Sequence, residues 1–91
     1  TLKVGDMKLK FIHTPGHTPG SMCIKIDKHM LTGDTLFAGS IGRTDFYGGD
    51  FKKMEKSLKR LKNQDDDIAI YPGHGPNSNI KIEKMTNPFM R

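Results

Sequence analysis

The chain has 91 residues, 34% of them hydrophobic, and a formal net charge of +5, a length that fits one small domain or part of a larger one. A single cysteine, Cys23, excludes an internal disulfide and fits a reducing compartment. No apolar run approaches the roughly 20 residues of a membrane-spanning helix, so we expect a cytoplasmic protein with no membrane partner.

The first half of the chain predicts three strands. Hydrophobic residues alternate with lysines from Met7 to Phe11, which is the period of a half-buried strand. A loop with two prolines and two glycines follows this strand and excludes helix. Two further apolar segments come after the loop, joined by a turn. The expected strands are 7–13, 22–26 and 29–32.

The second half predicts two helices and one strand. Residues 35–49 are rich in glycine and small side chains, which indicates a long ordered loop. Asp50 can cap a helix in which four apolar residues recur at helical spacing and face a core. These four are Phe51, Met54, Leu58 and Leu61. The remaining expected elements are a strand at 68–71 covered on both faces and a short helix at 80–85.

The excess positive charge lies on the first of these helices. Six basic residues there oppose Glu55 alone, which leaves +5, and the rest of the chain is neutral. The six are Lys52, Lys53, Lys56, Lys59, Arg60 and Lys62. We interpret them as a solvated helix surface, with a phosphate-binding patch as the alternative. No aromatic residue alternates with the lysines to form a platform for single-stranded nucleic acid, so we do not expect a nucleic-acid partner.

Three side chains with metal-binding chemistry stand at strand ends. His17, Asp34 and His74 each follow an apolar strand and lie among glycines or prolines. Open α/β sheets bind ligands at such ends, and imidazole and carboxylate suit zinc. Each residue alone also fits a purely structural role. A histidine in a loop can be a hydrogen-bonded surface residue, and Asp34 can stabilise a turn. The residue pattern by itself leaves the metal site open, and it predicts a surface role for His29.

The loops resemble successive signatures of the metallo-β-lactamase superfamily. The three motifs are His13-Thr-Pro-Gly-His17-Thr-Pro-Gly-Ser21, Leu31-Thr-Gly-Asp34-Thr-Leu-Phe37 and Tyr71-Pro-Gly-His74-Gly-Pro76. They are most similar to the glyoxalase II-like thioester hydrolases, as are the stretches 39–46 and 83–89. The resemblance runs from about Leu9 to Phe89. It implies an α/β fold in which residues 1–91 form the C-terminal half of an αββα sandwich, a mixed sheet with two helices.

The resemblance also implies roles for individual residues. His17 matches a ligand of the first metal, Asp34 the catalytic carboxylate that bridges both metals, and His74 a ligand of the second. His13 matches a histidine that does not bind metal and shapes the loop. The implied cofactor is a pair of zinc ions, with iron or manganese as alternatives.

Substrate contacts are less clearly implied. Arg43 stands where glutathione thioesterases of this type carry a basic residue near the glutathione moiety, and a guanidinium there can hold a carboxylate bidentately. An ion pair with Asp45 is the alternative. Pro76 and Asp45 occupy places where such enzymes have Tyr, which weakens the glutathione assignment more than the superfamily assignment.

The first signature of the superfamily, His-x-His-x-Asp-His, does not occur in the sequence. The chain also begins with Thr1 rather than Met, which suggests a processed or cut start. We therefore expect little or no activity from these residues alone. A half sandwich leaves an apolar sheet face uncovered, so we expect pairing with the missing N-terminal half, with a second copy or with a partner.

The implied reaction is hydrolysis of a thioester, such as an acylglutathione, by a hydroxide held between two metals. Three alternatives remain at this stage. One is an iron-dependent persulfide dioxygenase of the same superfamily, and another is a nuclease. The third is a non-catalytic half-domain used for interaction, its loops retained as scaffolding.

Overall fold

A mixed sheet of six strands forms the frame of the molecule. The structure is a computed structural model that describes residues 2–5, 7–45 and 48–90. The strands lie in the order β1 (Leu2–Val4), β2 (Met7–His13), β3 (Met22–Ile26), β4 (His29–Gly33), β7 (Ala69–Pro72) and β8 (Ser78–Asn79). All neighbours are antiparallel except β4 and β7, which run parallel. The three strands expected in the first half are confirmed.

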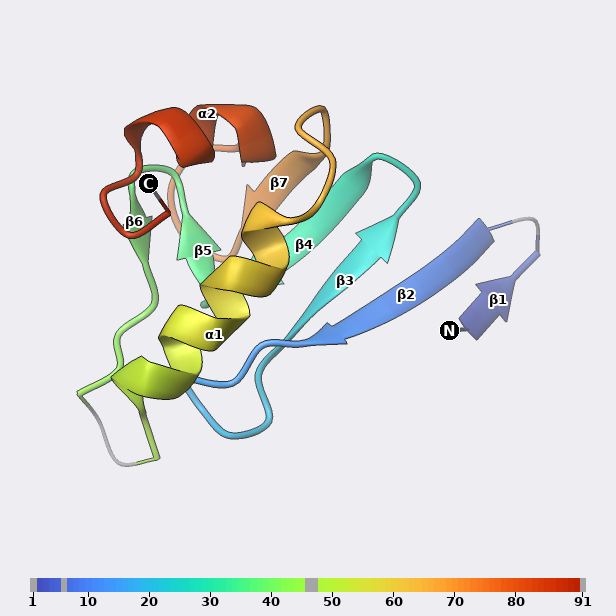
Figure 1. Cartoon of the computed structure of the whole chain (residues 1–91). Coiled ribbons are helices and arrows are strands. Elements are labelled where there is room, and N and C mark those ends of the chain that lie inside the picture. Colours follow the sequence, from blue (N-terminus) through green and yellow to red (C-terminus); the bar gives the residue numbers. More distant parts are fainter. Residues whose placement is uncertain (1, 6, 46–47, 91) are drawn as a thin grey trace.

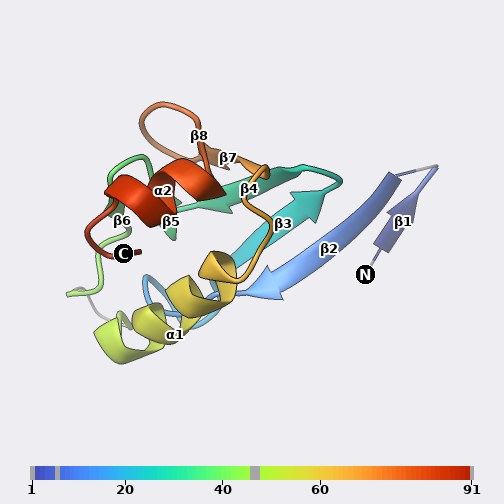
Figure 2. The ribbon, with the colours of Figure 1, turned by 45° about the horizontal axis from the view of Figure 1, so that its top comes forward.

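The connection from β4 to β7 carries the elements that build the second layer. It contains a small hairpin of β5 (Leu36–Phe37) and β6 (Ser40–Ile41), followed by α1 (Phe51–Lys62). The second helix, α2 (Ile80–Thr86), follows β8 directly. Both helices lie on one face of the sheet, while β1 and the outer end of β2 extend beyond them (Figures 1 and 2). The expected α/β class, a mixed sheet with two helices, is confirmed.

Helix α1 begins and packs much as its sequence predicts. Asp50 is extended, and its carboxylate accepts a hydrogen bond from the Lys53 amide, which satisfies one of the free N–H groups of the first turn. Met54, Leu58 and Leu61 are buried, but Phe51 is 49% exposed. The prediction that Phe51 faces the core is wrong. Buried Ser57 lies beside Leu58 and shifts the centre of the buried stripe, so that Phe51 stands at its margin.

The core fills the space between the sheet and the helices. Met30, Ile70 and Cys23 contribute from the sheet, and they pack with apolar side chains of both helices and the C-terminal segment. The helical and C-terminal contributions are Met54, Leu58, Leu61, Ile80 and Met90. Burial raises the pKa of the Cys23 thiol, which keeps it protonated within this core.

The opposite face of the sheet is apolar and has no helix over it among the described residues. Phe11 is 43% exposed, Met22 48% and Leu31 46%. On β7, Ile70 is fully buried whereas Ala69 and Tyr71 are only half-buried. The expectation that this strand is covered on both faces is therefore met on one face only.

Four short strands were not expected from the sequence. They are β1, β5, β6 and β8, each two or three residues long, too short to show a periodic pattern. The hairpin of β5 and β6 lies within the stretch expected to be loop. Phe46 and Tyr47, which belong to the same stretch, lie outside the described residues.

Candidate metal centre

Three loops meet at one edge of the sheet. Strands β4 and β7 are parallel, so Asp34 after β4 and His74 after β7 leave the sheet at the same edge. Strand β2 is antiparallel to β3, which is antiparallel to β4, so the loop after β2 also leaves at this edge and carries His17. The topology thus brings the three predicted residues together, as sheets do at the carboxyl ends of their strands.

One carboxylate lies between two imidazoles. His17 Nε2 is 3.7 Å from Asp34 Oδ2, and His74 Nε2 is 3.3 Å from Asp34 Oδ1. Each histidine therefore faces a different oxygen of the same side chain. This is the arrangement in which a carboxylate can offer one oxygen to each of two cations.

A hydrogen bond on Nδ1 fixes the orientation of the His17 ring. Its Nδ1 lies 2.7 Å from the backbone oxygen of Arg43. A carbonyl oxygen only accepts hydrogen bonds, so Nδ1 carries the proton and donates it. The lone pair of the neutral ring is then on Nε2, the atom that faces Asp34, and a second hydrogen bond of this kind is typical of metal-binding histidines.

Two glycines allow the loops to approach one another. A Cβ at Gly42 would lie 1.5 Å from the Asp34 backbone oxygen and 3.4 Å from His17 Cβ. A Cβ at Gly73 would lie 3.3 Å from the Gly33 oxygen, the same atom to which the Gly73 amide donates at 2.8 Å. The absence of a side chain is required at Gly42 and avoids a tight contact at Gly73.

Helix α1 anchors the loop that carries His17. Ser57 Oγ donates to the Pro15 oxygen at 2.7 Å, and Arg60 donates to the His13 oxygen at 2.6 Å. A Cβ at Gly16 would clash with the Met54 backbone, so the loop lies directly on the helix. The His13 ring donates from Nε2 to the Pro19 oxygen at 2.8 Å, which agrees with the expected loop-shaping role.

His74 is held more loosely than His17. Its side chain is 78% exposed, against 26% for His17 and 46% for Asp34. Its ring makes an edge contact with Phe37 of β5, with the ring centroids 5.8 Å apart.

Other polar residues on or near these loops form hydrogen bonds of their own. Arg43 pairs with Asp45, and this hydrogen bond lowers the pKa of the Asp45 carboxyl. Thr18 and Ser21 bond one another across their loop. His29 Nδ1 lies 2.8 Å from the Tyr71 hydroxyl, away from the three loops, as expected of a surface residue.

The side chains suit a shared metal pair but do not complete it. Among the described residues, no three or more His, Cys, Asp or Glu side chains gather around one point that could hold a metal ion. Each metal would receive one imidazole nitrogen and one carboxylate oxygen from this chain. Zinc sites in proteins use three or four protein ligands. Imidazole nitrogen and carboxylate oxygen are donors that zinc accepts, so the chemistry of the side chains fits. Two donors per metal are too few, so the remaining ligands would have to come from outside this chain.

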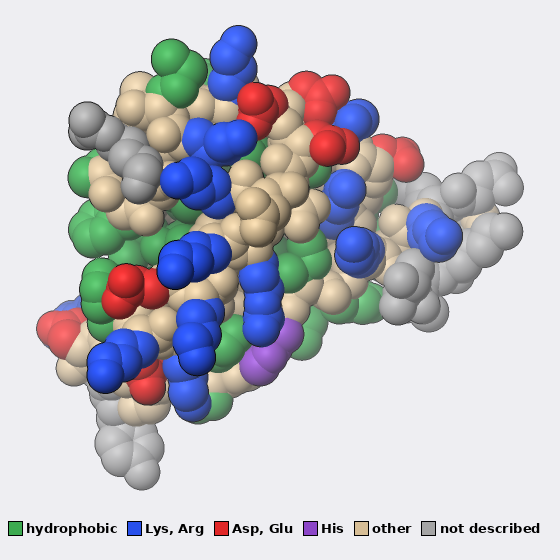
Figure 3. All heavy atoms as spheres, viewed as in Figure 1, with side chains coloured by type: hydrophobic (Ala, Val, Ile, Leu, Met, Phe, Trp, Pro, Cys, Tyr) green, Lys and Arg blue, Asp and Glu red, His purple; other side chains and the backbone are tan. Residues whose placement is uncertain are grey.

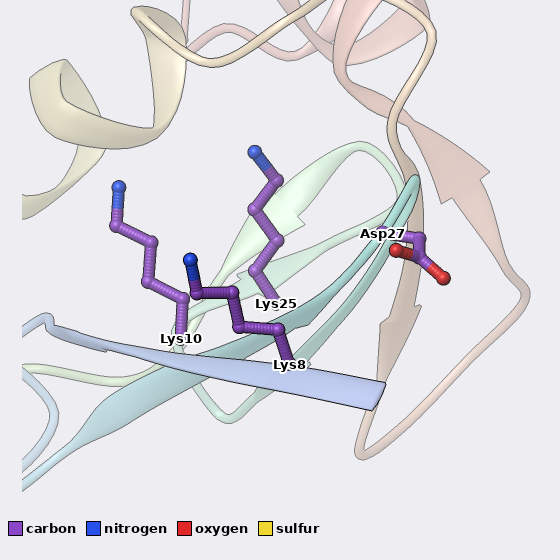
Figure 4. A pocket seen from close by; sticks show the side chains of 4 residues that line it. All are labelled: Lys8, Lys10, Lys25 and Asp27. Carbon is purple, nitrogen blue, oxygen red and sulfur yellow. The ribbon is translucent and has the colours of Figure 1, made fainter. Parts of the chain in front are cut away.

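The basic residues lie apart from this centre. Lysine and arginine side chains gather along α1 (Figure 3). A hollow of about 380 Å³ is lined by Lys8, Lys10, Lys25 and Asp27 at the far end of β2 and β3 (Figure 4). The three lysines reach into it side by side, and none of the metal-site candidates lines it. Neither feature supplies a candidate metal ligand.

Comparison with known families assigns the chain. A family model described as the metallo-beta-lactamase superfamily matches residues 1–74. The chain belongs to this superfamily. It is 44% identical over 92 residues to a hydroxyacylglutathione hydrolase, GloC, of Haemophilus influenzae, which covers 98% of this chain and 43% of the relative. Superfamily membership supports a metal-dependent, hydrolase-like protein.

Solved structures of the superfamily share the fold closely. ETHE1 from Myxococcus xanthus superposes with a TM-score of 0.91 at 35% identity, covering 96% of this chain and 41% of that one. TTHA1623 in a di-iron-bound form gives a TM-score of 0.87 at 36% identity, covering 98% and 50%. The chain thus spans half or less of the length of these superfamily members. None of the described helices is long and apolar enough to cross a membrane.

Proposed function

We propose that this chain supplies one half of a two-metal centre that hydrolyses a thioester such as an acylglutathione. The observation that carries the proposal is the Asp34 carboxylate between His17 and His74. Similarity to the hydroxyacylglutathione hydrolase GloC supports the substrate class. Zinc is the proposed metal, with iron or manganese as the alternatives, and the similarity to a di-iron-bound structure supports a pair of metals.

The residues of this chain would divide the work as their geometry suggests. A bound metal pair supplies Lewis acidity and a water activated near neutral pH. Asp34 would present one oxygen to each side and so keep the two sites at a fixed spacing. His17 would offer a pre-oriented Nε2, because its Nδ1 is already held by the Arg43 carbonyl. Arg43, whose Nε pairs with Asp45, would be the candidate to hold a substrate carboxylate.

The complete centre requires a second half. We propose that a preceding N-terminal segment carries the missing ligands and covers the exposed sheet face of Phe11, Met22 and Leu31. The coverage of less than half of GloC supports this division. The 91 residues alone are then expected to bind metal weakly and to show little or no hydrolysis, because two ligands per metal are too few.

The test is metal content and thioester hydrolysis of the full-length protein. We expect two metals per chain, and a loss of at least about 100-fold in hydrolysis after His17→Ala, Asp34→Ala or His74→Ala. His29→Ala is the matched control, since this histidine lies outside the centre, and it should keep both metals and full activity. A full-length protein that holds two metals but cleaves no thioester would refute the substrate class.

A second candidate is an iron-dependent persulfide dioxygenase. The similarity to ETHE1 is compatible with it. One iron per chain, together with oxygen consumption in the presence of a persulfide, would favour the dioxygenase. A protein that binds no metal at all would leave a non-catalytic half-domain.

A further inference from the structure

A buried carboxylate on α2 joins the β5–β6 hairpin to β8. Glu83 is 1% exposed. Its Oε1 accepts a hydrogen bond from the Gly39 amide at 2.8 Å, in the turn between β5 and β6. Its Oε2 accepts one from the Ser78 hydroxyl at 2.6 Å, on β8. One side chain therefore bridges the hairpin whose Phe37 contacts the His74 ring and the strand that follows the His74 loop.

Asn87, one helical turn later, completes the bridge. Its Nδ2 donates to Glu83 Oε1 at 3.0 Å and to the Ser40 oxygen at 2.9 Å, and it lies 3.3 Å from the Phe37 oxygen. The Asn87 Oδ1 accepts from the Phe89 amide at 2.9 Å, which fixes the orientation of the amide group. Glu83 and Asn87 together hold the backbone of the hairpin at three places, Phe37, Gly39 and Ser40.

These contacts define where His74 can lie. The Phe37 ring is the aromatic group that touches the His74 ring, and its backbone is held by Asn87. At the other end, Ser78 begins the strand into which the His74 loop returns. Because His74 is 78% exposed, its own packing is slight, and its position depends on the anchoring of its loop and of Phe37.

Stability alone does not account for a carboxylate at this place. Burying a charge is costly unless it is paired and hydrogen-bonded. Glu83 accepts three hydrogen bonds, but among the described residues it forms no ion pair. Well-packed apolar residues often replace buried charges without loss of stability. We therefore expect the contribution of Glu83 to be the positioning of the hairpin and of β8, to which it is bonded.

We propose that Glu83 is a positioning residue that fixes His74 for the second metal by tying the β5–β6 hairpin to β8. The proposal rests on the proposed two-metal function. It assigns to α2 a part in the centre although none of its side chains reaches it. The helix is thus a support for the metal half that His74 serves, as α1 is for the half that His17 serves.

The test compares Glu83→Ala, Glu83→Gln and Ser78→Ala in the full-length protein. Affinities of the two metals are measured by chelator competition. We expect Glu83→Ala to weaken the second metal by about 10-fold or more and to spare the first. Glu83→Gln should rescue it, because Oε1 can still accept from Gly39 and Asn87 while the amide donates to Ser78. Glu55→Gln, on the exposed side of α1, is the matched control.

Ser78→Ala removes one hydrogen bond only, so it keeps the proposal testable if Glu83→Ala does not fold. It should weaken the second metal more than the first. Equal weakening of both metals, or none, in the variants that fold would overturn the proposal. A wild-type protein that binds no metal would refute the two-metal function instead. Hydrogen exchange of the Gly39 amide and of residues 73–77 in the metal-free protein then still reports positioning, and exchange unchanged by Ser78→Ala would overturn it.

Discussion

At the scale of single residues, the two histidines of the first motif are held in opposite ways. His17 donates from Nδ1 to Arg43, whereas His13 donates from Nε2 to Pro19. Both acceptors are backbone carbonyls, so each ring is locked in one tautomer. Only His17 keeps a lone pair on the nitrogen that faces Asp34, which explains why one histidine of the pair is suited to a metal and the other to the loop.

This difference is directly measurable. In the metal-free protein we expect long-range ¹H–¹⁵N spectra to show the Nδ1–H tautomer for His17 and the Nε2–H tautomer for His13. The two residues serve as controls for each other. The same tautomer at both positions would contradict the hydrogen bonds on which the orientation of His17 depends.

Gly42 is expected to tolerate no side chain. A Cβ there would overlap the Asp34 backbone oxygen at 1.5 Å, and backbone cannot move aside as the end of a side chain can. Gly42→Ala should lower the free energy of unfolding by at least about 2 kcal/mol, measured by urea denaturation. Gly20→Ala, where a Cβ meets nothing within 4 Å, should change it by less than about 0.5 kcal/mol.

Sequence predicted the candidate donors, which the structure brings together, but not what holds them. His17, Asp34 and His74 were identified because they stand in family-like motifs after apolar strands. The Arg43 carbonyl that orients His17 carries no sequence signal, since every residue has a carbonyl. The spacing of Gly42 from Asp34 likewise says nothing about an overlap that arises only when the hairpin folds back. The bridging role of Glu83 depends on contacts to residues far away in the chain.

At the scale of elements, α1 is both a core helix and the support of a loop. Its apolar side packs under the sheet, while Ser57 and Arg60 donate to backbone oxygens of the His17 loop. The helical period predicted the first role. It did not predict the support of the loop. Arg60 stands in a run of basic residues, and composition cannot reveal that it donates to the His13 oxygen.

The capping of α1 by Asp50 can be tested by mutation. Asp50→Ala removes the cap of the helix, and we expect a loss of about 1 kcal/mol in the free energy of unfolding, read from the urea midpoint at an unchanged slope. Asp50→Asn should retain most of the stability, because an amide oxygen can still accept from the Lys53 amide. Lys52→Ala, on the exposed side, is the control. An equal loss in all three variants would argue against capping.

At the scale of the whole molecule, the two faces of the sheet differ in kind. One is sealed by α1 and α2, and the other exposes Phe11, Met22 and Leu31 at 43–48%. Hydrophobic alternation predicted strands with one buried face, but it could not tell which face this chain covers itself. The burial of apolar surface is the main favourable term of association, so the open face is the expected site of pairing.

We expect the 91-residue chain on its own to self-associate in light scattering as its concentration rises. Replacing Phe11, Met22 and Leu31 together by Thr should shift it towards a monomer, because threonine keeps the strand propensity and removes apolar area. Lys53→Thr on the exposed side of α1 is the control. A wild-type chain that stays monomeric and binds no hydrophobic dye would show that this face needs no cover.

The parallel pairing of β4 with β7 also sets an order of events during folding. Met30 lies opposite Ile70, so the hairpin and α1 must both be accommodated before these strands can meet. Closing so long a connection costs chain entropy before the contact between β4 and β7 can stabilise the fold. Such non-local pairings form slowly. His17 and Asp34 follow strands that pair with near neighbours in the chain, whereas His74 follows β7, whose pairing with β4 is non-local. His74 is therefore expected to join His17 and Asp34 at the candidate metal centre only when β7 pairs with β4, late in folding.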